Sequence, residues 1–164
     1  MSNSPSTLTT TNNLQVHTSK VVIVYTEWNE NIINELVAGA KRIFDKYSDK
    51  INYELIQVPG CVEIPHIIKH HFDYNGQIIH AYIAFGCVIR GETAHFDYVC
   101  NSVTDGITYL NTTISTPTIF GVLTVNNVQQ AMDRIGGVHG HKGEEAAISA
   151  IKMIDIKQSI RIKK

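Results

Sequence analysis

Polar and aromatic side chains collect in this sequence directly after four runs of apolar, mostly β-branched residues. Each run is predicted to be a buried strand, and the residues that follow include an indole, carboxylates, a glycine-rich turn and an imidazole. The four segments are Glu27-Trp28-Asn29, Pro59-Gly60-Cys61-Val62-Glu63, residues 86–95, and Thr124-Val125-Asn126-Asn127. Ligands of open parallel sheets bind beyond the carboxyl ends of the strands, so these segments form the candidate site.

Trp28 and Glu63 are the groups best suited to hold an organic ring that carries hydroxyl groups. Trp28 is the only tryptophan and could stack on a planar heterocycle, whereas Glu63 could accept hydrogen bonds from a polyol. Each residue also has a structural alternative. Trp28 could pack as a hydrophobic staple on the next helix, and Glu63 could be a first-turn acid stabilised by the helix dipole.

The segment from Arg90 to His95 combines a possible anion-binding turn with a group that can transfer protons. Gly91 allows close backbone approach, free N–H groups at a helix start attract anions, and Thr93 adds a hydroxyl. Glu92 counts against a phosphate unless its carboxylate points away. His95 is the best candidate for proton transfer, because imidazole titrates near neutral pH. The alternative for His95 is a capping or packing role.

The other histidines and the cysteines do not have the spacing of a metal site. His66 and His70 have the i,i+4 spacing of a helical pair but lack a third ligand, and His139 and His141 only flank a glycine. The three cysteines contain no CxxC pair, which indicates reduced thiols in a reducing compartment. We therefore expect no bound metal and a cytoplasmic location.

Strands and helices are predicted to alternate along the chain. Apolar runs predict strands over residues 20–26, 53–58, 80–85 and 118–123. Apolar residues at helical spacing predict helices over about 32–47, 63–72, 96–110, 128–135 and 142–156. This alternation implies right-handed crossovers and a parallel sheet. The predicted fold class is α/β, a flavodoxin-like three-layer α/β/α sandwich around a four-stranded, mainly parallel sheet.

The composition indicates one globular domain with a polar arm before it. The net charge of −1, with Lys and Arg dispersed over 164 residues, gives no footprint for nucleic acid or an acidic membrane. Residues 1–13, rich in Ser, Thr and Asn, are predicted to be a disordered arm, residues 14–158 the domain, and residues 159–164 a short basic tail. The first cation is Lys20 and no apolar stretch approaches the ~20 residues of a membrane span, so neither a targeting peptide nor a membrane span is expected.

Taken in order, the motifs closely resemble those of the lumazine synthase family, from about residue 20 to residue 156. The matching stretches are Glu27-Trp28-Asn29, Pro59-Gly60-Cys61-Val62-Glu63-Ile64-Pro65, residues 86–99, Phe120-Gly121-Val122-Leu123-Thr124, Gln130-Ala131 with Arg134, and residues 140–147. The VIRGxTxHFDYV pattern within residues 86–99 is long and highly specific. Its occurrence in order with the PGxxEIP pattern makes coincidence implausible.

The resemblance implies an activity and a role for each matched residue. The family condenses 5-amino-6-(D-ribitylamino)uracil with 3,4-dihydroxy-2-butanone 4-phosphate, giving 6,7-dimethyl-8-ribityllumazine, phosphate and water. This is the penultimate step of riboflavin biosynthesis and needs no metal or redox cofactor. His95 would shuttle protons. The residues expected to hold the pyrimidine and its ribityl chain are Trp28, Asn29, Cys61, Val62, Glu63, Cys87, Val88, Ile89, Phe120 and Lys142. Those expected to bind the phosphate are Gly91, Glu92 through its main chain, Thr93 and Arg134.

The resemblance also implies a homo-oligomer whose active sites lie between subunits, with Phe120, Arg134 and Lys142 supplied by the neighbour. The sequence leaves two assemblies as alternatives, a pentamer and an icosahedral shell of sixty subunits. The segment between Arg134 and Lys142 lacks the insertion seen in some pentamer-only members, which favours the shell. Functional coupling to riboflavin synthase is a further implied partnership. His141 and Cys61 depart from the family pattern, which often has Asn and usually has Ala at these positions.

Three other interpretations compete with the enzyme. A non-catalytic flavin- or lumazine-binding protein would keep Trp28 and Glu63 but could dispense with His95 and Arg134. A structural shell protein could retain only vestigial catalysis. A generic flavodoxin-like or receiver domain is the third, but a receiver needs an acidic pocket at the strand ends, and these segments lack one. The joint presence of His95 and Arg134 favours the enzyme.

Overall fold

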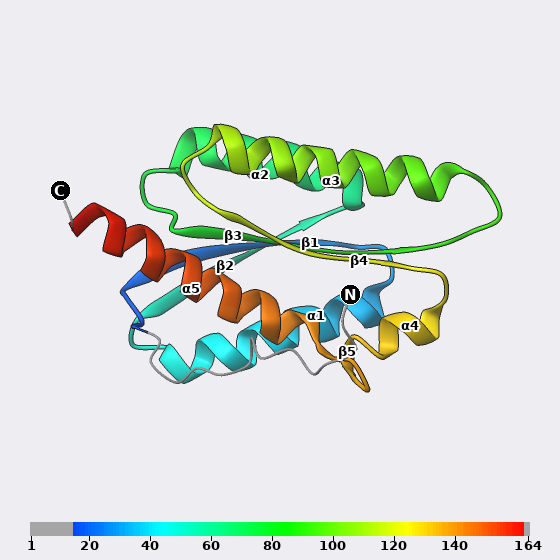
Figure 1. Cartoon of the computed structure of the whole chain (residues 1–164), viewed down its shortest axis with the longest axis horizontal. Helices are drawn as coiled ribbons and strands as arrows, with labels where there is room; N and C mark the ends of the chain where they lie inside the picture. The colour runs from blue at the N-terminus through cyan, green and yellow to red at the C-terminus, as the bar shows by residue number, and fades with distance from the viewer. Residues whose placement is uncertain (1–14, 163–164) are drawn as a thin grey trace.

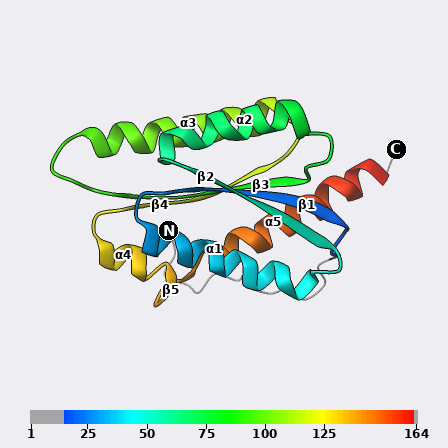
Figure 2. The same ribbon diagram turned by 180° about the vertical axis from the view of Figure 1, so that it is seen from behind.

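The computed structural model describes residues 15–162 and forms three layers (Figure 1). A four-stranded parallel sheet with strand order β2-β1-β3-β4 is the middle layer. Helices α2 and α3 cover one face, and α1 and α5 cover the other, as the view from behind in Figure 2 also shows. The predicted three-layer α/β fold is therefore confirmed.

The elements follow one another in the alternating order that the sequence predicts. They are β1 (Ser19–Thr26), α1 (Glu30–Phe44), the 3-10 turn η2 (Asp45–Tyr47), β2 (Ile51–Val58), the 3-10 turn η3 (Cys61–Glu63), α2 (Ile64–Asn75), β3 (Ala81–Ile89), α3 (His95–Thr113), β4 (Thr118–Val125), α4 (Val128–Met132), β5 (Ile135–Gly137), β6 (Gly140–His141) and α5 (Lys142–Ile162). The short β5 and β6 form a separate antiparallel hairpin.

The central strands carry apolar side chains on both faces because each face is covered by helices. Val21 and Ile23 of β1 belong to the core on the α1 and α5 side. Val22 and Val24 belong to a second core, on the α2 and α3 side. All four side chains are fully buried. The continuous β-branched run in β1 is thus explained by alternate residues that fill two cores.

The ends of several elements differ from those predicted. Residues 86–89 and 124–125, predicted as loops, continue β3 and β4, because the two strands stay paired as far as Ile89 and Val125. Helix α4 ends at Met132, and Ile135 enters the hairpin instead of continuing the helix. Helix α5 continues past residue 156 to Ile162.

None of the helices within residues 15–162 is long and apolar enough to span a membrane. The predicted N-terminal arm, residues 1–13, lies outside the described residues. The α2–α3 layer and the α1–α5 layer both reach the end of the sheet where the strands terminate (Figure 1). The candidate residues are therefore divided between the two layers.

Candidate active site

Trp28 and Glu63 lie on either side of Gly60, where β1 and β2 end. A Cβ atom built on Gly60 would lie 3.0 Å from Glu63 Oε2 and 3.7 Å from Trp28 Cδ1. The amide of Glu27 donates to the Val58 carbonyl oxygen at 2.9 Å, which holds the two strand ends together. Trp28 is 74% exposed, so its indole is not packed as a staple. An open aromatic face beside a carboxylate is suited to a planar ring with a hydroxylated substituent.

Asn29 connects the end of β1 to β3 through its side chain. Its Nδ2 donates to the Cys87 carbonyl oxygen at 2.8 Å, and its backbone has φ 62, the only positive φ among non-glycine residues of the described chain. Asn tolerates this left-handed conformation better than most residues. The amide group is thus engaged with the protein itself, and the conformation sets the direction of Trp28 just before it.

The strand β3 extends past the end of its pairing with β1. The β1–β3 ladder ends at Tyr25 opposite Phe85, whereas β3 continues beside β4 to Ile89. The backbone of residues 86–89 therefore has one edge bonded to β4 and one edge that faces the β1 side. The Cys87 carbonyl oxygen already accepts from Asn29 Nδ2, and the remaining backbone N–H and C=O groups of this edge can bond a ligand.

Cys61 and Cys87 do not have the properties of reactive thiols. Both are buried, and burial raises the pKa of the Cys61 thiol to about 12 and that of Cys87 to about 11. A thiol with such a pKa stays protonated at neutral pH and is a poor nucleophile. These residues can contribute backbone groups and apolar surface to the site.

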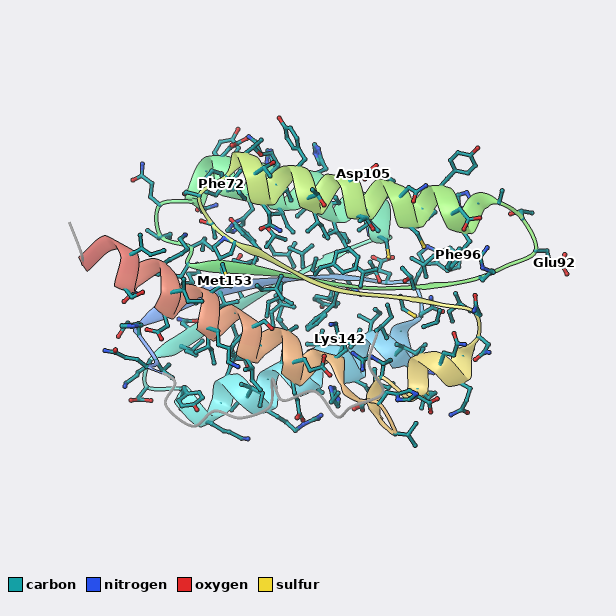
Figure 3. The ribbon with its side chains drawn as sticks, in the orientation of Figure 1. Phe72, Glu92, Phe96, Asp105, Lys142 and Met153 are labelled. Carbon is teal, nitrogen blue, oxygen red and sulfur yellow. The ribbon has the colours of Figure 1, made fainter. Side chains whose placement is uncertain are left out.

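The loop between β3 and α3 presents exposed polar groups at the same end of the sheet. Gly91, Glu92, Thr93 and His95 are all exposed. The amide of His95, the first residue of α3, donates weakly to Thr93 Oγ1 at 3.4 Å. Figure 3 shows Glu92 at the outer tip of this loop, so its carboxylate extends away from the helix start. The objection that Glu92 would repel a bound phosphate is therefore weakened.

Arg134 and Lys142 lie in the other layer, next to a buried carboxylate that the sequence does not single out. Arg134 Nη2 is 3.2 Å from Glu145 Oε2, and Lys142 Nζ is 3.6 Å from the same oxygen. Arg134 Nη1 also donates to the His139 carbonyl oxygen. Glu145 is only 5% exposed. Two cations around one carboxylate leave a net positive charge, which can attract a phosphate.

The sheet separates these two groups within one chain. Lys142 lies below the sheet at the start of α5, whereas Glu92 and Phe96 belong to the layer above it (Figure 3). Phe120 lines a hollow of about 450 Å³ between α3 and β4, together with Phe96 and Thr124. The chain therefore does not bring Arg134 and Lys142 together with His95 in one pocket.

His66 and His70 pair by ring contact on the surface of α2. Their rings are 6.2 Å apart and nearly parallel, and His70 also contacts Tyr74. Within residues 15–162, no three His, Cys, Asp or Glu side chains are grouped as a metal site requires.

His141 is half-buried against α1, and its ring has no hydrogen-bond partner. A Cβ atom on Gly39 would lie 2.2 Å from His141 Cε1, so only glycine leaves room for the ring. Both ring nitrogens are inaccessible and unpaired. Burial and the nearby charge of Arg42 lower the pKa of His141 below its ordinary value of 6.5, and these effects outweigh Glu144 of α5 and Glu35 of α1.

This arrangement predicts an acid-sensitive contact between α1 and the hairpin. Because the folded protein favours neutral His141, its stability is complete above about pH 6.5 and falls as the pH drops below that value toward the lowered pKa. We expect His141→Asn to reduce the loss of Tm between pH 7 and pH 5, measured by thermal unfolding. His139→Asn, at an exposed position in the same hairpin, is the control. Equal acid sensitivity in all three proteins would contradict the role of His141.

Comparison with known proteins identifies the family of the chain. Residues 18–158 match the family model described as 6,7-dimethyl-8-ribityllumazine synthase. The 6,7-dimethyl-8-ribityllumazine synthase of Parabacteroides distasonis is 46% identical over 134 residues, 81% of this chain and 82% of the relative. Proteins of the same name from Cytophaga hutchinsonii and Bacteroides fragilis are 47% and 44% identical, covering 80% and 86% of this chain and 82% and 98% of their own lengths. The chain belongs to the 6,7-dimethyl-8-ribityllumazine synthase family.

Proposed function

We propose that this protein condenses 5-amino-6-(D-ribitylamino)uracil with 3,4-dihydroxy-2-butanone 4-phosphate to give 6,7-dimethyl-8-ribityllumazine, phosphate and water. The observation that carries the proposal is the grouping of an exposed indole, a carboxylate, the end of β3 beyond its pairing with β1, and the exposed loop before α3 at one end of the sheet. This is the step of riboflavin biosynthesis after which the family is named.

The pyrimidine is placed at the ends of β1, β2 and β3. Trp28 stacks on the ring, and the exposed carboxylate of Glu63 accepts hydrogen bonds from the ribityl hydroxyls. The open backbone edge at Cys87, Val88 and Ile89 bonds the polar edge of the ring. Cys61 and Val62 contribute main-chain groups. Asn29 acts through the Cys87 carbonyl that it holds at 2.8 Å.

The phosphate of the second substrate is placed at the loop before α3. The start of this 19-residue helix supplies backbone N–H groups and a favourable dipole. Gly91 and Thr93 border the site, with Glu92 taking part through its main chain. Arg134 supplies the opposing charge.

We further propose that a neighbouring subunit completes the site with Phe120, Arg134 and Lys142. Two observations support this. Within one chain the sheet separates Lys142 from Glu92 and Phe96, between which His95 lies in the sequence (Figure 3), and Trp28 and Tyr98 are each 74% exposed. A closed ring of five subunits repeats one interface between subunits, and twelve such rings form a sixty-subunit shell. Coupling to riboflavin synthase, which would consume the product, and a cytoplasmic location complete the proposal.

The reaction requires several proton transfers that one histidine can serve. The pyrimidine amine attacks the ketone and loses water to form an imine, and phosphate then leaves by elimination. The resulting enol tautomerises to a ketone, and the ribityl-bearing nitrogen attacks this ketone and closes the ring with loss of a second water. His95 gives and takes protons in these steps. Holding the two substrates in register supplies much of the remaining acceleration.

The direct test is to mix the purified protein with both substrates and follow the absorbance of the lumazine product. An enzyme-free control is essential, because these substrates condense slowly unaided. Product formation well above this background establishes the activity. A second outcome is a folded protein whose Trp28 fluorescence is quenched by a pyrimidine ligand while product forms only at the background rate. That result would favour the non-catalytic binding protein instead.

Arg134→Ala is expected to impair use of the phosphorylated substrate selectively. Loss of a charge-assisted contact of about 1.5–3 kcal/mol predicts a rise of at least tenfold in the KM for the sugar phosphate. The KM for the pyrimidine should change little. Steady-state kinetics with each substrate varied in turn provide the measurement, with Arg42→Ala as the control on α1. An unchanged KM for the sugar phosphate would remove Arg134 from the phosphate site.

A further inference from the structure

Arg90 stands where β3 ends and connects three parts of the structure. Its amide donates to the Val125 carbonyl oxygen at 2.8 Å. Its Nε donates to Asn126 Oδ1 at 3.2 Å, just beyond β4. Its two terminal nitrogens bond both carboxylate oxygens of Asp97 in the first turn of α3, at 3.0 and 3.4 Å. The guanidinium carbon also lies 4.0 Å from the centre of the Phe96 ring.

These contacts fix both ends of the loop that runs from Gly91 to Ala94. The guanidinium holds the start of the loop at the end of β4 and, through Asp97, holds the start of α3 against the same point. The loop itself has few constraints. A Cβ atom on Gly91 would meet nothing within 4 Å, and the bond between the His95 amide and Thr93 Oγ1 is long, at 3.4 Å.

The guanidinium is already engaged, so it is poorly placed to be a phosphate ligand. Asp97 takes two of its N–H groups in a bidentate pair, and Asn126 takes a third. The pair with Asp97 also balances its charge. Only the planar, forked head of arginine can hold a carboxylate in this way while it lies over an aromatic ring. Lysine at this position would retain the charge but lose the geometry.

We propose that Arg90 is a positioning residue for the phosphate loop, acting through Asp97 and Asn126 without touching the phosphate. The role rests on the proposed function, since it assumes that residues 91–94 hold the phosphate of the second substrate. The side chains of Arg90 and Asp97 are 44% and 55% exposed, and exposed ion pairs add little to global stability. A positioning role is nevertheless important, because displacing a substrate by about 1 Å can slow catalysis about a hundredfold.

The test compares Arg90→Gln, Arg90→Lys and Asp97→Asn with the control Lys69→Gln. Lys69 forms an ion pair with Asp73 on α2 with side chains 44% and 49% exposed, a close match to the Arg90 pair. We expect both Arg90 variants to lower kcat/KM for the sugar phosphate about 10- to 100-fold. Asp97→Asn should lower it in the same direction. Lys69→Gln should leave it within twofold. The pyrimidine Kd, measured by quenching of Trp28 fluorescence, and the Tm should stay close to those of the unmodified protein in all four variants.

A second measurement does not need turnover. Calorimetric titration with inorganic phosphate should give a Kd at least about tenfold higher for Arg90→Gln than for the unmodified protein, following the displacement of the loop. If the unmodified protein binds no phosphate, the loop is not a phosphate site and the role of Arg90 is overturned.

The remaining outcomes separate the alternatives. Arg90→Gln kinetics equal to those of Lys69→Gln would overturn the positioning role while the proposed function stands. Full activity in Asp97→Asn with loss in Arg90→Gln would make Arg90 a direct ligand and overturn the indirect role. An equal loss of kcat/KM for both substrates in the Arg90 variants would indicate a general structural role and overturn the positioning role. If the unmodified protein showed no turnover but its phosphate binding still depended on Arg90, the proposed function would be wrong. The role of Arg90 in positioning the loop would then stand.

Discussion

His95→Ala is expected to lower kcat about a hundredfold while the fold is retained. General acid–base catalysis by a positioned side chain contributes about 10²- to 10⁴-fold, and the low end applies because these substrates also react unaided. The imidazole is exposed at the first position of α3. The hydrogen bond of His95 to Thr93 uses the backbone amide, which alanine keeps. We therefore expect His95→Ala to lower kcat without lowering the stability of the fold.

The measurement is kcat at saturating concentrations of both substrates, with the enzyme-free rate subtracted. His66→Ala is a matched control, because His66 is also exposed in the first turn of a helix and makes only a ring contact with His70. We expect its kcat to equal that of the unmodified protein. If His95→Ala turned over at the unmodified rate, protons would have to move by another route and His95 would lose its assigned role.

The fold is predictable from the sequence because its strands serve two cores at once. A run such as Val21-Val22-Ile23-Val24 has no polar alternation, and only a strand covered on both faces buries it completely. The loop boundaries are less predictable. Residues 86–89 include a glycine at the end of an apolar run, which is typical of a turn. Pairing with β4 decides their conformation, and pairing across the sheet leaves no mark in the local sequence.

The candidate site is predictable where a residue acts by its own chemistry and position. Trp28, Glu63 and His95 follow strands and are exposed, as the location of ligands at strand ends predicts. The supporting contacts are not predictable in this way. Glu145 lies eleven residues beyond Arg134, in the first turn of α5, and Arg90 meets Asn126 across 36 positions of sequence. Such pairs depend on the register of β3, β4 and the hairpin.

His141 shows how a departure from the family pattern can be absorbed by the fold. A larger ring in place of Asn requires space, and that space exists because Gly39 of α1 has no side chain. The cost is two buried nitrogens without partners. The ring packs next to Lys142, the first residue of α5, so the same turn links packing within the α1–α5 layer to the candidate site.

Gly143→Ala is expected to destabilise the fold strongly. Gly143 lies in the first turn of α5, where a Cβ atom would be 2.1 Å from the Leu36 carbonyl oxygen and 2.8 Å from its carbonyl carbon. These are backbone atoms of α1, so no side-chain rotation can relieve the clash. The two helices must separate, and overpacking of this kind costs about 3 kcal/mol. The start of α5 would also shift, and Lys142 and Glu145 would move with it.

The free energy of unfolding, measured in urea at one fixed protein concentration, gives the size of the effect. The matched control is Gly91→Ala, because its Cβ would meet nothing within 4 Å and its stability should stay within about 0.5 kcal/mol of the unmodified protein. A fall of about 3 kcal/mol in Gly143→Ala alone would mean that α1 and α5 are held at their closest approach by this glycine. The rise in KM for the sugar phosphate should then accompany the loss of stability, since Arg134 is fixed by Glu145 at 3.2 Å. Unaltered stability in Gly143→Ala would show instead that α1 moves aside freely and that the contact with Leu36 does not set the spacing of the layer.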